Sequence, residues 1–460
     1  MVSTADMPRT SRAPQPRAPG GAAGGPVLRP LARRVHFLAG ILIAPFVLLL
    51  CLTGLVYVFS PQIHDNLYAQ QLYVHHVGDA PRPVAEQVAA AMDAHPEAEL
   101  RSVVPPPEPG RTTRVNLSVP SLSERGEART VYVDPYTNYI SGELTTMNDR
   151  LPANVWLRDL HSNLHLGEIG RLYAQVAASW LPAVVLGGVL LWVAKQGRRR
   201  RSARELLVPV PRGKGTQSRL RSVHGPLGLW LAFGLVGMSV TGLMMGGLPN
   251  ARVPQLALAP VAVPSDVRTL TVDEMLDVAR AEGLDGELRV TPPAVPDRPA
   301  VVAETAPGRD GIAVDPYTGA VTERIGWDDY AFLAKVRTLG TEAHTGALFG
   351  VANQILLALL AVATIVLIVV GYLMWWAKRS PYQGPLPPAP PPAVRELTHP
   401  VRAAILLVVA VLGYLVPVFG VSLVAFVVAD LAINAVRRRR ARRPVRQRVT
   451  LGQREPSRTR

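Results

Sequence analysis

Four histidines of this chain lie at matching positions near the ends of long apolar segments. His36 and His224 each open such a segment, and His165 and His344 each stand just before a further one. Because an unpartnered polar group in a membrane is costly, these positions indicate function. Two neutral imidazoles fill both axial positions of a heme iron. No Cys-x-x-Cys-His motif is present, so the pattern predicts two b-type hemes, held by His36 with His224 and by His165 with His344.

Residues close to these histidines fit the same interpretation. Gly40 and Gly228 follow their histidines by four positions, on the same helical face, where a missing side chain leaves room for a flat macrocycle. Close helix packing through small residues is the alternative for both glycines. Arg33 and Arg221 precede the histidines by three positions and suit heme propionates, because guanidinium matches carboxylate geometry. Their alternative role is a general positive charge at the inner face of the membrane.

The second pair has another candidate ligand. His161 and His165 are four residues apart and are expected on one helical face, so either residue can be the ligand. We assign His165, because His165-x-Gly matches His344-x-Gly, and keep His161 as the alternative or as a residue near the substrate. The spacing also resembles a zinc-binding pair, but no third ligand is evident. Histidines without repeat partners are expected at the surface, although the neighbouring His75 and His76 could contact a metal chelate there.

Four apolar segments are long enough to span the ~30 Å hydrocarbon layer of a membrane, and the first is expected to be a retained helix. A fifth apolar stretch is broken around Pro417 and Gly420, which predicts two short spans or a re-entrant hairpin without an assigned role. The predicted order is a disordered cytoplasmic tail (1–30), a first span (31–60), an outer domain (61–165), a second span (166–194), a basic cytoplasmic loop (195–222), a third span (223–247), a second outer domain (248–345), a fourth span (346–377), a Pro-rich cytoplasmic linker (378–400), the hairpin (401–436) and a basic cytoplasmic tail (437–460).

Charge predicts the orientation of these spans. The loop 195–222 holds ten Lys or Arg and a single acidic residue, and the tail from Arg437 onward is equally basic, whereas acids outnumber bases in both polar stretches. Because positively charged loops stay inside, both termini are expected in the cytoplasm and both polar domains outside. Topology and contact with anionic lipid explain the net charge of +15, so a nucleic-acid partner is not expected.

The chain repeats a set of motifs in the same order. Both copies keep the same orientation, which predicts a parallel repeat about an axis along the membrane normal. The matched motifs are Arg-x-x-His-x-x-x-Gly (33–40 and 221–228), Thr-Gly (53–54 and 241–242), Val-Asp-Pro-Tyr-Thr (133–137 and 314–318), His-x-Gly (165–167 and 344–346) and Trp-x-x-Lys (192–195 and 375–378).

Each outer domain is predicted to be a small α+β module. Helical periodicity covers 83–94 and 271–281, and Thr271 with Glu274 has the spacing of a capping box. Asp-Pro-Tyr-Thr predicts a turn in both copies, because proline presets the turn and aspartate can bond the backbone ahead. Alternating runs predict strands at 114–119, 130–133, 300–304 and 311–314.

This combination of motifs resembles the PepSY-associated transmembrane family, over about residues 30–380. Its better-understood members are similar to inner-membrane ferric-siderophore reductases that hold two b-type hemes. The resemblance implies a multi-pass protein of the bacterial inner membrane, with transmembrane helices and two extracytoplasmic PepSY-like domains. It implies an enzyme of iron acquisition that reduces a ferric siderophore or another ferric chelate outside. No Gly-x-Gly-x-x-Gly dinucleotide motif follows a strand, so the donor is expected to be quinol or a separate reductase.

Two other classes of function remain open. PepSY modules elsewhere resemble protease-inhibitory propeptide regions, so the outer domains could bind or regulate a partner, with the helices as an anchor and no redox activity. A parallel repeat also fits a transporter for iron or heme, but the spans are almost free of ionisable residues, with Asp430 the exception near a helix end. Both alternatives predict a colourless purified protein, whereas a di-heme protein is red.

Overall fold

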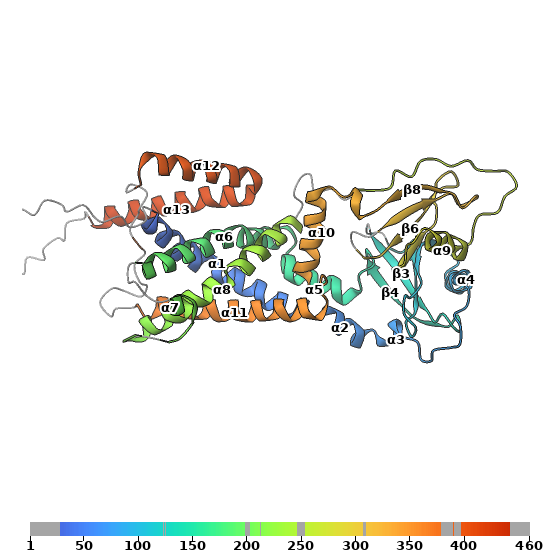
Figure 1. Cartoon of the computed structure of the whole chain (residues 1–460), viewed down its shortest axis with the longest axis horizontal. Helices are drawn as coiled ribbons and strands as arrows, with labels where there is room; N and C mark the ends of the chain where they lie inside the picture. Colours follow the sequence, from blue (N-terminus) through green and yellow to red (C-terminus); the bar gives the residue numbers. More distant parts are fainter. Residues whose placement is uncertain are drawn as a thin grey trace, which may run out of the picture.

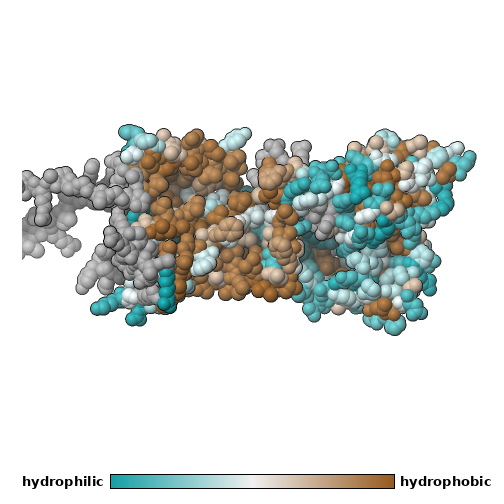
Figure 2. Space-filling view, viewed as in Figure 1, coloured by the Kyte–Doolittle hydropathy of each residue, from teal (hydrophilic) through white to brown (hydrophobic). Residues whose placement is uncertain are grey.

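The molecule is elongated, with a helical bundle at one end and a sheet domain at the other (Figure 1). The computed structural model describes residues 28–122, 124, 126–197, 203–211, 213–245, 254–306, 310–378, 390 and 397–441. Apolar side chains cover the bundle, and polar side chains cover most of the sheet domain (Figure 2). This division is the one expected of a chain that crosses a membrane and carries a water-exposed domain.

Four long helices coincide with the four predicted spans. They are α1 (Arg29–Tyr57), α6 (Gly167–Gly197), α8 (Thr216–Met245) and α11 (Val351–Trp376). Each is long and apolar enough to cross a membrane. Helices α1 and α8 both contact α6 and α11, so α1 and α8 occupy one diagonal of the bundle. Side chains from α1 and α8 therefore meet in its interior.

The broken apolar stretch forms an antiparallel pair of helices, α12 (His399–Leu415) and α13 (Pro417–Ala441). Helix α13 is also long and apolar enough to cross a membrane, whereas α12 is shorter. Helix α13 packs on α6. The ring centre of Trp180 in α6 lies 5.4 Å from that of Phe419 in α13, and Trp180 Nε1 donates a hydrogen bond to Ser422 Oγ of α13 at 2.8 Å. This stretch, which had no predicted role, thus packs against the outer surface of the four-helix bundle.

Short helices cover the two ends of the bundle. Helix α7 (Ala203–Leu207) contacts α6 and α8 in the predicted cytoplasmic loop. At the other end, between bundle and sheet, lie α2 (Ser60–Leu67), α3 (Ala69–Leu72), α5 (Pro152–Asn163) and α10 (Phe332–Thr345). A single turn of 3₁₀ helix, η1 (Trp327–Asp329), leads into α10.

The two predicted outer modules form one continuous antiparallel sheet and not two separate bodies. Each contributes four strands, in the order β4-β3-β2-β1-β5-β6-β7-β8, and the halves join where Val103 pairs with Val290. The strands are β1 (Glu99–Val104), β2 (Thr113–Ser118), β3 (Glu127–Val133), β4 (Ile140–Met147), β5 (Leu288–Thr291), β6 (Ala300–Glu304), β7 (Gly311–Val314) and β8 (Val321–Ile325).

One face of the sheet buries a hydrophobic core that both halves share. Inward residues alternate along the strands, as Val115 and Leu117 do in β2. Helices α4 (Val84–Ala94) and α9 (Val272–Ala281) cover this face on the side away from the bundle. The remaining face of the sheet points toward the membrane helices, and its side chains are largely polar.

Local sequence signals set the ends of these elements as predicted. The Thr271–Glu274 capping box forms at the start of α9. In the two Asp-Pro-Tyr-Thr turns, the Asp134 carboxylate accepts the Tyr136 N–H at 2.8 Å and the Asp315 carboxylate accepts the Tyr317 N–H at 2.9 Å. The four predicted strands and both outer helices are confirmed, with boundaries shifted by a few residues.

An ion pair fixes the C-terminal helix to the first span. Arg34 of α1 is 6% exposed, and its Nε lies 3.3 Å from Asp430 of α13, whose carboxylate also pairs with the terminal guanidinium nitrogen. Arg34 donates to the Pro390 carbonyl as well. A buried guanidinium without a counter-charge is strongly destabilising.

Asp430→Ala should therefore lower the free energy of unfolding by about 3 kcal/mol, because Arg34 stays buried without its carboxylate. The thermal unfolding midpoint of the detergent-solubilised protein measures the effect. Glu168→Ala is the matched control, since its pair with Arg171 is exposed and contributes less than about 1 kcal/mol. Equal midpoints for both variants would contradict a structural role for the α13 contact.

Candidate functional site

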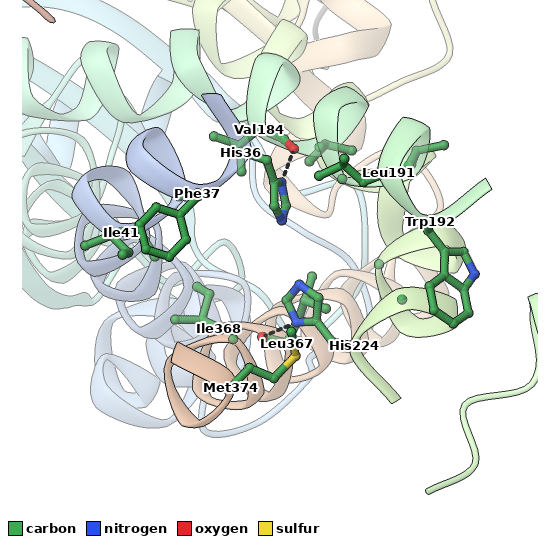
Figure 3. A pocket seen from close by; sticks show the side chains of 18 of the residues that line it. His36, Phe37, Ile41, Val184, Leu191, Trp192, His224, Leu367, Ile368 and Met374 are labelled. Atoms are coloured by element: carbon green, nitrogen blue, oxygen red, sulfur yellow. Dashed lines mark hydrogen bonds between the residues drawn. The ribbon is translucent and has the colours of Figure 1, made fainter. Parts of the chain in front are cut away.

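His36 of α1 and His224 of α8 face each other inside the bundle (Figure 3). Their ring centres are 6.2 Å apart across a cavity of about 660 Å³. His36 Nδ1 lies 2.7 Å from the Val184 carbonyl oxygen of α6, and His224 Nδ1 lies 3.1 Å from the Leu367 carbonyl oxygen of α11. The two halves of the chain thus hold their histidines with the same type of bond.

These bonds fix which nitrogen carries the hydrogen. A carbonyl oxygen only accepts, so Nδ1 of His36 and of His224 must be the donor. The lone pair is therefore on Nε2 in both rings, and these nitrogens point toward each other across the cavity (Figure 3). A histidine oriented by a backbone carbonyl through one nitrogen is the usual arrangement of a metal ligand that binds through the other.

The separation of the two rings suits one shared metal ion. A metal–imidazole bond is about 2 Å long and a ring nitrogen lies roughly 1 Å from the ring centre, so two imidazoles on opposite sides of one ion have centres roughly 6 Å apart. The distance between the His36 and His224 ring centres, 6.2 Å, agrees with this value. The cavity between them is of the size that holds cofactor-sized ligands.

A glycine on the facing helix makes room for each histidine. In an α-helix, the side chain of residue i+4 lies over the carbonyl of residue i, because side chains tilt toward the N-terminus. A Cβ at Gly188, four residues after Val184, would lie 2.7 Å from His36 Cε1. A Cβ at Gly371, four residues after Leu367, would lie 3.3 Å from His224 Cε1. We did not predict this carbonyl-and-glycine arrangement from the sequence.

The predicted glycines beside the histidines line the same cavity. A Cβ at Gly40 would meet its nearest neighbour at 3.9 Å, and one at Gly228 at 3.7 Å, which are ordinary contact distances. Neither glycine is therefore required for close helix packing, and both line the cavity wall.

Cationic side chains line one end of this cavity. Arg33, Arg221 and Lys378 all do so. The two arginines are the ones for which the sequence suggests pairing with heme propionates. Burial, followed by the positive charges of Arg221 and Arg33, lowers the pKa of Lys378. Positive charges gathered at one place favour an anionic group beside them, and carboxylates suit the arginine geometry.

A second pair of histidines lies toward the sheet end of the bundle. His161 of α5 lies with Nδ1 2.9 Å from Thr53 Oγ1 on α1, and His344 of α10 lies with Nδ1 2.8 Å from Thr241 Oγ1 on α8. The adjacent glycines again make room, since a Cβ at Gly54 would be 3.0 Å from the His161 ring and one at Gly242 would be 3.1 Å from the His344 ring.

The threonines fix the tautomer of this pair as the carbonyls do for the other. Each hydroxyl donates its single hydrogen to a carbonyl one turn back, at 2.9 Å for Thr53 and 2.8 Å for Thr241, so its oxygen accepts from Nδ1. Burial lowers the pKa of His161 to about 4, and burial together with the nearby His161 lowers the pKa of His344 to about 4. Both imidazoles are neutral at pH 7 and present Nε2 as a possible ligand.

The geometry favours His161 over His165, which we assigned from the sequence. Helix α5 ends at Asn163 and Leu164 has a left-handed φ of 55°, so His165 does not share a helical face with His161. The exposed His165 ring lies 5.0 Å from that of Trp156. The arrangement on one helical face that the i, i+4 spacing suggested, and that a zinc-binding pair would need, therefore does not form. The sequence does contain a signal for His161. The number of residues between His161 and His344 equals the number between Val184 and Leu367 and between Gly188 and Gly371.

The neighbouring His75 and His76 are exposed in the segment between α3 and α4. Among the described residues, neither makes a contact that assigns it a role in a site.

Fold and site together define an α-helical multi-pass membrane protein with a water-exposed antiparallel sheet and paired histidines inside its bundle. Residues 33–378 match the family described as the PepSY-associated TM region, and the chain belongs to this family. The match includes both histidine pairs and both halves of the sheet. No curated protein matches the chain.

Gly188→Ala should destabilise the protein by about 1–3 kcal/mol, because the new methyl group overlaps the His36 ring and displaces it from the Val184 carbonyl. Gly237→Ala in α8 is the matched control, since nothing lies within 4 Å of a Cβ built there. Thermal unfolding of both variants in detergent compares them. A stable Gly188→Ala protein with an unmoved His36 would show that the facing helix is not tightly packed on this ring.

Proposed function

We propose that this protein carries electrons across the bacterial inner membrane through two b-type hemes and reduces a ferric chelate on the outer side, as an enzyme of iron acquisition. The observation that supports the proposal is the arrangement of His36 and His224. They come from different helices, both present Nε2 to a cavity of cofactor size, and their ring centres have the separation that one shared iron requires.

At the inner site, His36 and His224 would hold the heme iron through Nε2. The Val184 and Leu367 carbonyls hold the rings in place and raise the basicity of Nε2, as such partners do at metal sites. Arg33, Arg221 and Lys378 would neutralise the heme propionates at the cationic end of the cavity. This end is the cytoplasmic one if the basic loops lie inside.

At the outer site, His161 and His344 would be the ligands, oriented by Thr53 and Thr241. When bound, a heme held by two imidazoles would supply one-electron transfer. The protein's own residues fix the positions of the two sites, exclude water and balance charge. The two sites lie toward opposite ends of the same helices, which is what transfer across a membrane requires.

The matching contacts in the two halves support a parallel repeat. We propose that α1, α5 and α6 form one unit and α8, α10 and α11 a second, related by a pseudo-two-fold axis along the membrane normal. Each site then takes one histidine from each unit. The electron donor would be quinol or a separate reductase on the inner side, since the sequence carries no dinucleotide motif. The acceptor would be a ferric siderophore or another ferric chelate.

The alternative is a membrane-anchored binding or regulatory protein without redox activity. Such a protein has no need for two pairs of histidines whose Nε2 atoms are left available, one pair inside the bundle and one at its outer end. A transporter is disfavoured for a different reason. Its substrate path would place ionisable residues at the membrane midplane, and the sequence of the spans is almost free of them. Heme content separates both alternatives from the proposal.

Single variants of the inner pair test the ligand assignment. His36→Ala and His224→Ala should each remove one of the two hemes, because a single imidazole leaves one axial position of the iron empty. The heme-to-protein ratio of the purified protein, from a pyridine hemochrome assay, measures the loss. His399→Ala, at the exposed start of α12, serves as the control and should leave the ratio unchanged. Unchanged heme in all three variants would rule out the inner site.

A second comparison distinguishes the two candidates for the outer ligand. His161→Ala should remove the outer heme, because this residue and not His165 bonds to Thr53 across from His344. His165→Ala should keep both hemes. Absorption spectra and heme ratios of the two purified variants provide the readout. The reverse result would restore His165 as the ligand and require α5 to be longer than the structure has it.

A further inference from the structure

A second cavity, of about 380 Å³, lies between the sheet and the helices at the outer end of the bundle. Strand alternation explains its polar lining. In β2, Val115 and Leu117 face the shared core, so Arg114 and Asn116 face the bundle. Thr130 Oγ1 donates a hydrogen bond to Asn116 Oδ1 at 2.7 Å, and both side chains line the sheet side of the cavity.

Two nitrogen atoms of residues that line this cavity are buried and make no hydrogen bond. They are His64 Nε2 and Arg289 Nε. His64 is only 9% exposed. Buried polar atoms are nearly always hydrogen-bonded, because leaving one unpaired is costly. Two such atoms beside one cavity therefore indicate a bound ligand, and the Arg289 Nε–H requires that this ligand accept a hydrogen bond.

The charge of the cavity points to an anion. Arg114 and Arg289 form ion pairs with Glu287 at 2.7 Å and with Asp149 at 2.9 Å, and Arg289 keeps a buried Nε without a hydrogen bond. Arg150 adds a third guanidinium to the lining, against two carboxylates, those of Asp149 and Glu342. Guanidinium groups bind carboxylates more strongly than they bind neutral acceptors. A carboxylate is thus the group that suits Arg289 Nε and its neighbouring guanidinium groups best.

The ligand should also donate a hydrogen bond. Asn154 Oδ1 lines the same cavity and is a buried acceptor without a partner. A hydroxyl group on the ligand would satisfy it. A small molecule with both carboxylate and hydroxyl groups therefore complements the whole lining, and the cavity lies within the usual size range of small-molecule sites.

The cavity directly adjoins the outer histidine pair. Tyr57 lines it and stacks on His161, with ring centres 6.3 Å apart and planes 10° from parallel. Thr341 and Thr345 of α10 line it as well, on the helix that carries His344. A molecule bound here is separated from the outer pair by only one layer of side chains.

We propose that this cavity binds a small hydroxycarboxylate anion, and that a ferric ion held by such a ligand is the electron acceptor. The second part rests on the proposed function. In that step Fe³⁺ gains the one electron that originates from the inner-side donor and becomes Fe²⁺. The weaker attraction of Fe²⁺ for carboxylate oxygens then releases the metal. The anion itself is chemically unchanged.

Calorimetric titration of the full-length protein in detergent with gallium(III) citrate tests binding without reduction, because Ga³⁺ does not accept an electron under these conditions. The wild-type protein should bind it. His64→Phe, which keeps a ring but removes the nitrogen, and Arg289→Gln should each weaken binding by about tenfold or more, as expected for loss of a bond to a charged group. His76→Phe and Arg101→Gln, at exposed positions outside the lining, are the controls and should bind as the wild type does.

Absence of binding, or equal binding by all folded variants, would overturn the assignment of this cavity. Heme content measured on the same samples keeps the two proposals apart. Binding by a folded protein that takes up no heme would support the anion site and contradict the electron-transfer function. Heme uptake without binding would contradict the anion site alone. Thermal unfolding midpoints identify any variant that fails to fold. If either His64→Phe or Arg289→Gln fails to fold, the other variant alone decides the test.

Discussion

An imidazole inside a membrane bundle must be hydrogen-bonded, and this constraint organises the centre of the protein. His36 and His224 satisfy it through backbone carbonyls of α6 and α11, which already accept bonds within their own helices and use a second lone pair. Those carbonyls are accessible only because Gly188 and Gly371 have no side chain to cover them. The glycines thus determine where the rings can lie, and the carbonyls determine which nitrogen is left for a ligand.

The arrangement of helices converts these local bonds into sites that join the two halves of the chain. Since α1 and α8 lie on a diagonal, histidines from different halves meet in the interior. The continuous sheet connects the same halves outside the bundle, through the pairing of β1 with β5. Helices α5 and α10 lie between bundle and sheet, so the outer histidines depend on both parts. A displacement of one half against the other would separate the members of each pair.

Much of this architecture could be predicted from local sequence signals, because apolar length, strand alternation and capping depend on neighbouring residues. The four spans, the Thr271 capping box and the Asp134 turn are of this kind, and His36 and His224 were found through their repeated motif. The choice between His161 and His165 required knowing where α5 ends, which the left-handed backbone at Leu164 shows. The interval that relates His161 to His344 can be interpreted only once the Val184 and Leu367 carbonyls are known to bind histidines. The joined sheet and the docking of α13 on α6 are contacts between distant segments, which periodicity alone does not reveal.

The most direct measurement is the absorption spectrum of the full-length protein, produced with heme available, purified in detergent and recorded before and after reduction with dithionite. Two histidine pairs that bind iron predict sharp low-spin b-type bands and a pyridine hemochrome count of two hemes per chain. A well-folded preparation without a Soret band would contradict the electron-transfer function and leave the histidine pairs as hydrogen-bonded packing residues.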